Sequence, residues 1–466
     1  MLVNRISNQW TTSRVSFTPA VAPHRGNAKW NRRIVLSPII FFEIYLSASV
    51  LTFAFGPWEW PVSNPWTLYS FLILAQVALL AGYLNGIKKR PSPASSRFRV
   101  PMPTAVVVSL IANYLWVGQL YRYRTGQVFD LAAAVRAATS GLTDPGRGYD
   151  ERVKNYLQRA TEASTIQDYI GLALFPLLWI AFPLAVFFWH QLSVPIRIAF
   201  IVWTIMDLFT WVAAGTNKGI ADFVILLPCL LLARKPAMLA NIRWRNVLLI
   251  GLIVVIGMTA LLAFFSAGML GRSGGRLMLL YDAQSGVGVA PDYLVLSHLP
   301  LAVQGALASV AMYFGGGYYG LSLTLQEPFV FCYGVGNSYF LEGLSRHLVS
   351  TPLIQNTYPA RIDTRRWNFY GKWHSIYPWI ASDLTFPGTL VFMFLMGRLF
   401  AVVWLDVAFC RNPWAVCLLP LLLIMLFYIP ANNQLLAFSP AAMPFFTLLV
   451  LWILSRPRSP IRRRIL

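Results

Sequence analysis

Charged side chains are scarce in this chain of 466 residues, since Asp, Glu, Lys and Arg together make up only 12% of it. In a water-soluble domain about a quarter of the residues are charged. Hydrophobic residues make up 57% and form continuous runs, which at about 1.5 Å per helical residue can cross roughly 30 Å of hydrocarbon. The alternating pattern of transmembrane barrel strands is not visible. The composition therefore predicts an all-α polytopic membrane protein.

Cysteine and the common cofactor motifs are also lacking. The chain has 4 cysteines without metal-ligand spacing, and most of them lie in or next to apolar runs, so we expect no disulfide framework. No glycine-rich P-loop, HExxH or CxxC pattern occurs, so nucleotide-dependent and zinc chemistry lose support and no cofactor is expected. The first 33 residues lack the apolar region and cleavage site of a signal peptide.

The apolar runs predict about ten membrane spans within a transmembrane domain of residues 34–455. A further apolar region, Leu301–Phe340, is interrupted by glycines, Glu327 and Pro328, and is expected to form a helical hairpin or a re-entrant segment. With it the estimate becomes about 10–12 transmembrane helices. The predicted spans are Ile34–Phe55, Trp66–Ile87, Thr104–Leu120, Tyr169–Phe188, Ile196–Ala214, Gly219–Ala233, Val247–Phe265, Phe386–Leu405, Trp414–Ile429 and Ala441–Leu454.

Acidic residues are few, at 17 against 38 Lys and Arg, and much of the formal charge of +21 flanks the apolar runs. That placement indicates orientation and lipid-headgroup contact rather than nucleic-acid binding. Counting through the spans brings four basic clusters to one side, and the positive-inside rule makes that side the cytoplasm. The clusters are the basic segment 1–33, residues 88–99, residues 234–245 and the tail 456–466.

Two long loops then face outward. The first, 121–168, mixes charges of both signs and is expected to form a partly helical cap. The second, 266–384, carries most of the ionisable side chains that precede the last spans. Both loops face away from ATP and sugar nucleotides.

The outer loop begins with a pair of arginines in GMLGRSGGR, residues 268–276. Arg272 and Arg276 share one face if this segment is helical, and guanidinium binds phosphate bidentately. Taken alone, the pair is more simply explained by ordinary headgroup contact of membrane-edge arginines.

A second candidate is the mixed stretch PARIDTRRWNFYGKWHS, residues 359–375. Cations beside aromatic rings suit a lipid-linked phosphosugar, because guanidinium holds phosphate and rings stack on sugars. An aromatic belt with basic neighbours is the alternative. The cations are Arg361, Arg365, Arg366 and Lys372, and the rings are Trp367, Phe369, Tyr370 and Trp373.

Three further charged residues lie at or within the spans. Lys218, in the outward turn GTNKG, is placed to reach an anion, although a plain polar turn is the simpler interpretation. Glu43 and Asp207 lie within apolar runs, where carboxylates are costly. They are either paired inside the bundle or serve proton-coupled transport.

The segment HSIYPWIASDLTFPG, residues 374–388, carries a family resemblance. It resembles the motif of the O-antigen polymerase (Wzy-type oligosaccharide repeat-unit polymerase) family, related to the O-antigen ligases. His374, Ser375, Asp383 and Gly388 fit that motif, whereas Thr385 stands where its first glycine is expected. The segment AMYFGGGYYGLSLTL, residues 311–325, is similar to the Tyr/Gly segment that precedes the motif.

The resemblance implies polymerisation of lipid-linked oligosaccharide repeat units at the periplasmic face of a bacterial inner membrane. A glycan leaves undecaprenyl pyrophosphate and joins the terminal sugar hydroxyl of another lipid-linked repeat. The implied enzyme is a metal-independent, inverting glycosyltransferase with a GT-C-like architecture, and its expected partners include a chain-length regulator and a flippase. A glycan ligase using the same donor, and a lipid-linked oligosaccharide flippase or transporter, are the rival hypotheses.

The roles of individual residues follow from this chemistry. A histidine with an ordinary pKa near 6.5 can take the acceptor proton, so His374 is the expected base, and Asp383 orients it or replaces it. Glu327 is the alternative base. Fixed cations stabilise the departing pyrophosphate, and rings contact glycan or lipid. The pyrophosphate-binding candidates are Arg272, Arg276, Arg365, Arg366 and Lys218, and the glycan- or lipid-binding candidates are Trp367, Tyr370, Trp373 and Tyr313.

Overall fold

A computed structural model describes residues 31–98, 100–143, 166–216, 218–240, 280–282, 285–290, 293, 298–299, 301–348, 352–365, 367–369 and 371–457. These residues are mainly helical. The helices are α2 (Arg32–Phe55), α3 (Pro65–Gly86), α4 (Met102–Thr125), α5 (Leu131–Thr143), α7 (Ile166–Phe187), α8 (Val194–Ala213), α9 (Lys218–Arg234), α10 (Ala237–Ala240), α13 (Leu301–Thr324), α14 (Tyr339–Leu348), α15 (Tyr358–Arg361), α16 (Ile376–Cys410), α17 (Pro413–Tyr428) and α18 (Ser439–Ser455).

Every predicted span that falls within the described residues forms a helix, and Val247–Phe265 lies outside them. Six helices in the described part are long and apolar enough to cross a membrane, namely α2, α3, α7, α8, α16 and the stretch Ser96–Thr125 that contains α4. The apolar helices α17 and α18 are shorter. The chain is therefore an all-α multi-pass membrane protein.

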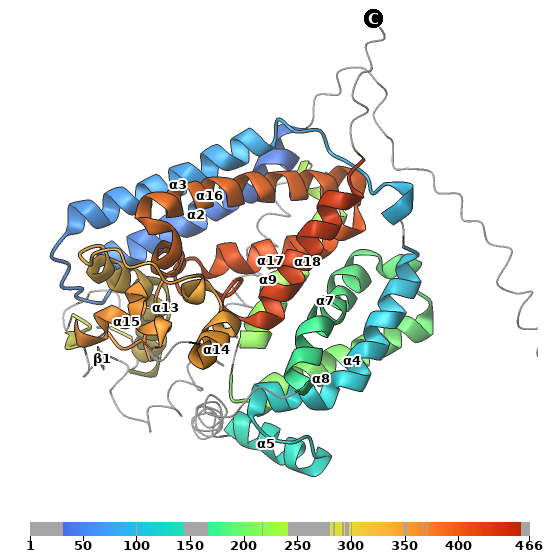
Figure 1. Ribbon diagram of the computed structural model, residues 1–466, viewed down its shortest axis with the longest axis horizontal. Coiled ribbons are helices and arrows are strands. Elements are labelled where there is room, and N and C mark those ends of the chain that lie inside the picture. Colours follow the sequence, from blue (N-terminus) through green and yellow to red (C-terminus); the bar gives the residue numbers. More distant parts are fainter. Residues whose placement is uncertain are drawn as a thin grey trace, which may run out of the picture.

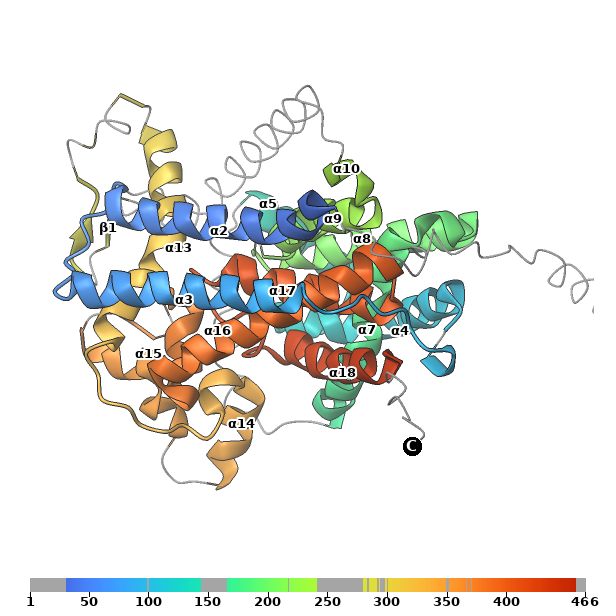
Figure 2. The same ribbon diagram turned by 90° about the horizontal axis from the view of Figure 1, so that it is seen from above.

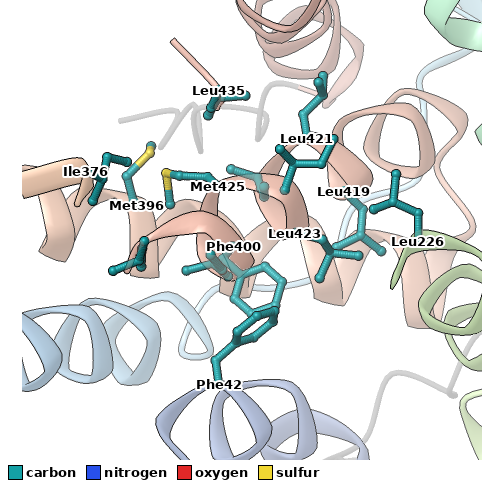
Figure 3. Packing of buried hydrophobic residues seen from close by; sticks show 14 of the residues in the cluster. Phe42, Leu226, Ile376, Met396, Phe400, Leu419, Leu421, Leu423, Met425 and Leu435 are labelled. Carbon is teal, nitrogen blue, oxygen red and sulfur yellow. The ribbon is translucent and has the colours of Figure 1, made fainter. Parts of the chain in front are cut away.

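The long helices form two groups with α17 and α18 between them (Figure 1). In one group α2, α3 and α16 run side by side, and in the other α4 packs on α7 and α8. Residues 415–426 of α17 are all buried, which explains why this helix is apolar on every face. Around it Phe42 of α2 meets Phe400 of α16 edge to face at 5.7 Å, and Leu226 of α9 lies near Leu419 (Figure 3).

Glycines allow α3 and α16 to touch backbone to backbone. A Cβ atom on Gly82 would lie 1.9 Å from the carbonyl oxygen of Phe394, and one on Gly397 would lie 2.0 Å from that of Leu79. Gly82 and Gly86 form the small-xxx-small spacing that brings membrane helices together closely. These two helices run parallel over most of their length.

One end of the bundle, here called the basic end, collects the basic clusters of the described residues. It holds the start of α2, the loop after α3 and the ends of α9, α16 and α18 (Figure 2). The Arg456 guanidinium donates to the Arg90 carbonyl at 3.0 Å, and the Trp414 indole donates to the Phe98 carbonyl at 3.0 Å. The described parts of the clusters that the positive-inside rule requires to share one side therefore lie at one end.

The opposite end, here called the loop end, is formed by residues 56–64, 325–338, 352–365, 367–369 and 371–375. Helix α13 lies crosswise over it, because successive turns of α13 contact the single segment 58–64 (Figure 2). Trp58 donates to the Ala308 carbonyl at 2.8 Å, and Asn64 donates to the Ser322 carbonyl at 3.1 Å. A two-stranded hairpin, β1 (Tyr281–Asp282) with β2 (Val287–Gly288), pairs beside Trp58.

The interrupted region 301–340 differs from the expected helical hairpin. It contains one 24-residue helix, α13, followed by an irregular segment and the start of α14. The three glycines 315–317 lie inside α13 instead of breaking it.

Helix α16 has a break at Thr385, where φ is 66° and ψ is 167°. The Thr385 hydroxyl accepts from the Gly388 N–H at 3.3 Å, so Thr385 acts as an N-cap, and Pro387 follows within the first turn. The break therefore divides a loop-end segment, 376–384, from the predicted span that begins at Phe386.

Candidate functional site

The aromatic and cationic stretch 359–375 folds against α13 at the loop end, anchored by Trp367. Trp367 is fully buried, donates its indole N–H to the Trp373 carbonyl at 3.0 Å, and meets the Tyr319 ring edge to face at 5.0 Å. Tyr319 in turn stacks on Trp60 at 5.4 Å. Because no face of Trp367 is open, its observed role is packing.

The glycines of α13 let this stretch approach the helix. A Cβ on Gly317 would lie 2.0 Å from the Pro430 carbonyl oxygen and 2.7 Å from the Ser375 nitrogen. A Cβ on Gly320 would lie 2.8 Å from the Trp367 indole nitrogen. The close approach of Trp367 and Ser375 to α13 therefore explains why glycines occur in the Tyr/Gly segment.

His374 is buried just before α16, with only 2% of its surface exposed. Its Nε2 lies 3.4 Å from the Asn368 carbonyl oxygen, which can only accept, so Nε2 carries the proton and Nδ1 holds the lone pair. Burial lowers the pKa of His374 to about 4, against smaller opposing effects of the Asn368 carbonyl and Asp363. The imidazole is therefore neutral at pH 7.

Three buried polar atoms near α16 have no hydrogen-bond partner among the described residues. They are Nδ1 of His374, Oγ of Ser375 and Nε1 of Trp379. Unpaired buried polar atoms are uncommon in native structures and call for a ligand, a water or a function. The His374 and Trp379 rings lie 6.2 Å apart, so two of these atoms belong to neighbouring rings.

Two arginines of the stretch converge on Glu327. The Arg365 guanidinium lies 2.6 Å from a Glu327 carboxylate oxygen, and that of Arg361 lies 3.8 Å from the other. Arg361 also donates to the Pro328 carbonyl at 2.6 Å. Glu327 is thus held in an ion pair with two cations, which positions them and leaves it poorly placed as a free base.

Lys372 and Trp373 join the stretch to two other segments. Lys372 forms an ion pair with Asp282 of β1 and lies 5.7 Å from the centre of the Trp367 ring. The partly buried Trp373 ring lies 4.6 Å from the ring of Tyr313 on α13. Trp373 and Tyr313, predicted separately as glycan- or lipid-binding, are therefore neighbours.

Asp383 is engaged away from His374. One carboxylate oxygen accepts from the Gly334 N–H at 2.7 Å, and the other accepts from the Asn337 side chain at 2.8 Å. Asn433 donates to the same Asn337 side chain at 2.8 Å. These contacts tie the segment after α13 to α16, so Asp383 does not orient the imidazole in this conformation.

Lys218 is held by a different set of partners at the start of α9. It pairs with Asp222 at 2.6 Å, and the Tyr428 hydroxyl donates to the same carboxylate at 2.9 Å. Asp207 likewise pairs with Arg124 at 2.8 Å. Of the two carboxylates predicted inside apolar runs, Asp207 therefore has a cation partner, whereas Glu43 has a buried oxygen without a hydrogen-bond partner among the described residues.

Four predicted site residues, Arg272, Arg276, Arg366 and Tyr370, lie outside the described residues. Sequence reasoning missed several residues that the site uses. Three sequence signals could have pointed to them: the repeated tryptophans between α2 and α3, the glycine run in α13, and the amides 432–434. The missed residues are Trp60, Gly317, Tyr319, Gly320, Asp282, Asn337, Asn368 and Asn433.

Among the described residues, no three His, Cys, Asp or Glu side chains gather in a way that would hold a metal ion. Comparisons with protein-family models, curated proteins and solved structures return no match. The helices of the chain itself therefore define its class: it is a multi-pass helical membrane protein with a polar, aromatic loop end.

Proposed function

We propose that this protein polymerises lipid-linked oligosaccharide repeat units, with the loop end facing the periplasm and the basic end facing the cytoplasm of a bacterial inner membrane. The glycan passes from undecaprenyl pyrophosphate to the terminal sugar hydroxyl of a second lipid-linked repeat. The observation that supports this most is that the stretch 359–375 brings cations and aromatic rings to the same end of the bundle as a buried histidine, His374, whose Nδ1 lone pair has no hydrogen-bond partner.

The position of this group suits a lipid-borne diphosphate. Arg361, Arg365 and Lys372 lie at the end of the bundle where a span begins, which is where a polyprenyl chain leaves its phosphates. Each cation is already held by a carboxylate, so its side chain is ordered before a ligand arrives. A diphosphate competes with Glu327 for the two guanidiniums, because guanidinium binds both anions in the same bidentate way.

The transfer step assigns one task to each group. The acceptor hydroxyl oxygen bonds to the anomeric carbon, the bond from that carbon to the diphosphate oxygen breaks, and the electron pair leaves with the diphosphate. The hydroxyl proton goes to Nδ1 of His374, which becomes a stronger base once the burial that lowers its pKa is relieved, and the cations stabilise the charge on the leaving group. Gly320 and Trp379 cover the imidazole in this structure, so the acceptor reaches Nδ1 after this cover moves.

A reconstituted reaction tests the proposal. The full chain is placed in vesicles with lipid-linked repeats as both donor and acceptor, and products are separated by length. Chains of many repeats are expected from the wild type, and His374→Asn is expected to reduce their rate by roughly a hundredfold or more. Arg346→Gln serves as the control, because Arg346 lies exposed on α14, where it pairs with Glu342.

The rival functions give different products in the same vesicles. A ligase joins glycan only when a different acceptor is added, and a flippase moves intact donor across the bilayer without lengthening it. Either of these results, or full polymer synthesis by His374→Asn, would overturn the proposal.

A further inference from the structure

A pocket of about 270 Å³ lies at the basic end of the bundle, far along the chain from the proposed catalytic group. It lies between the short helix η3 (Trp189–Gln191), the last turn of α9 and α10. Half of its lining is cationic or titratable and half is apolar. The lining residues are His190, Leu231, Leu232, Arg234, Lys235 and Met238.

The pocket carries positive charge without a balancing acid. Arg234 and Lys235 form no ion pair with any described residue, and a third cation, Arg197, donates to the Trp189 carbonyl at 3.1 Å beside them. Arg234, then burial, Arg197 and Lys235 all lower the pKa of His190. The protonated ring is disfavoured because cations surround it, which marks a local excess of positive charge.

The carboxylate of Asp406 lies at the same end but is committed elsewhere. It accepts from the Ser92 N–H at 2.6 Å and from the Trp452 indole at 2.8 Å, and it pairs with Arg456 at 3.3 Å. Within the part of the chain that the structure describes, no other acid lies at the basic end to neutralise the pocket.

The apolar half of the lining is open to the surroundings. Leu231 is 45% exposed and Met238 is 49% exposed. A guanidinium and an ammonium beside exposed apolar side chains match a phosphate group attached to a hydrocarbon chain, and basic pockets between membrane helices bind such headgroups.

We propose that this pocket binds a phosphate group, with Arg234 and Lys235 on the phosphate and with Leu231 and Met238 beside the chain of an anionic lipid. Arg234 lies in the last turn of α9, where a cation also complements the helix dipole. That effect accounts for one cation on one helix, but it does not account for a cavity that Lys235 and His190 also line.

Binding to the purified full chain in a neutral detergent tests the proposal. The probes are short-chain phosphatidylglycerol, short-chain phosphatidylcholine and inorganic phosphate, each titrated to saturation. Phosphatidylglycerol is expected to bind saturably and more tightly than the other two. Arg234→Gln/Lys235→Gln is expected to bind it roughly thirtyfold more weakly, the factor for the loss of two contacts between basic side chains and an anionic headgroup.

Lys88→Gln/Lys89→Gln is the matched control, because it removes the same charge from exposed positions at the same end. A second variant, Met238→Trp, fills the pocket while keeping every cation, and it is expected to weaken binding similarly. Tight binding of inorganic phosphate alone would assign the site to a free phosphate and overturn the lipid assignment. Equal losses in Arg234→Gln/Lys235→Gln and in the control would overturn the site itself.

A spectroscopic readout separates binding from a structural role. A bound phosphate offsets the cations that surround His190, so phosphatidylglycerol is expected to raise the pKa of that imidazole, as followed by NMR of labelled histidine. An unchanged His190 titration at saturating lipid would contradict binding in this pocket.

Discussion

The cations at the two ends of the bundle differ in whether they have carboxylate partners. At the loop end, cations are matched by carboxylates, whereas at the basic end one acid among the described residues, Asp406, faces many cations. An ion pair holds a long side chain in one place, while a cation without such a partner is available to anionic headgroups. The loop-end pairs are Arg365–Glu327 and the pair of Lys372 with Asp282.

Charge sign and charge pairing therefore report different properties of the two ends. The excess of Lys and Arg at one end is the feature from which the positive-inside rule predicts the orientation of the chain. The pairing at the other end carries the positioning of side chains at the candidate site.

Removing the one acid of the basic end is expected to have the largest effect. Asp406 is fully buried and receives three donors, so Asp406→Ala leaves a cation and two N–H groups unpaired. We expect a loss of about 3–5 kcal/mol in the apparent free energy of unfolding in detergent. Glu327→Ala at the loop end breaks a half-exposed pair and is expected to cost about 1 kcal/mol or less. Equal losses in the two variants would contradict the comparison.

The loop end is expected to be sensitive to acid through His374. Its pKa is about 4 in the folded chain and near the ordinary 6.5 when unfolded, so the unfolded chain binds the proton more tightly. This contribution to stability is complete above about pH 6.5 and is lost as the pH falls toward 4, by about 3 kcal/mol in all. The free energy of unfolding, measured from pH 7.5 to 4 in the wild type and in His374→Gln, checks this. The variant is expected to lose less stability as the pH falls, because it lacks the contribution of the imidazole.

The close approach at α13 gives a smaller, local prediction. Gly317→Ala puts a methyl group against the Pro430 carbonyl and the Ser375 nitrogen, both backbone atoms, and we expect a loss of about 1–3 kcal/mol. The matched control is Gly343→Ala on α14, where nothing lies within 4 Å of the added atom. That control is expected to gain up to about 1 kcal/mol from helix propensity. Thermal unfolding of both variants distinguishes packing from propensity, and a stable Gly317→Ala would remove the reason given for the glycine.

The break in α16 gives the smallest prediction. Thr385 has a positive φ, in a region of backbone conformation that suits glycine almost alone, at a cost of about 1–3 kcal/mol. Thr385→Gly removes this strain and gives up one long N-cap hydrogen bond, so we expect a gain of about 1 kcal/mol. Thr389→Gly, one turn further along the same helix, is expected to lower the free energy of unfolding by about 1 kcal/mol. Destabilisation by both changes would show that the Thr385 side chain matters more than its backbone.

The sequence predicted the parts of the fold that depend on local pattern. The helices follow from apolar run length, and the expected start of a span at Phe386 matches the break at Thr385. The departure of Thr385 from the expected glycine was visible, but its physical meaning, a positive φ at that position, required the structure.

Contacts across long sequence separations could not be predicted in this way. The pair of Lys372 with Asp282 joins residues 90 apart, and the stack of Trp60 on Tyr319 joins two segments that no periodicity connects. The glycine run in α13 was expected to interrupt the helix. Tertiary packing overrode that propensity, because the missing side chains are what let residues 367–375 lie against α13.

The glycine contact between α3 and α16 has a consequence for how a lipid could enter. Leu79 and Phe394 carbonyl oxygens occupy the space of the absent side chains, so these two helices cannot part or slide without losing a continuous backbone seam. That flank is closed where Gly82, Gly86 and Gly397 bring the two backbones into contact. Under the proposed function, the entry path of a polyprenyl tail is therefore expected between other helices and not between this pair.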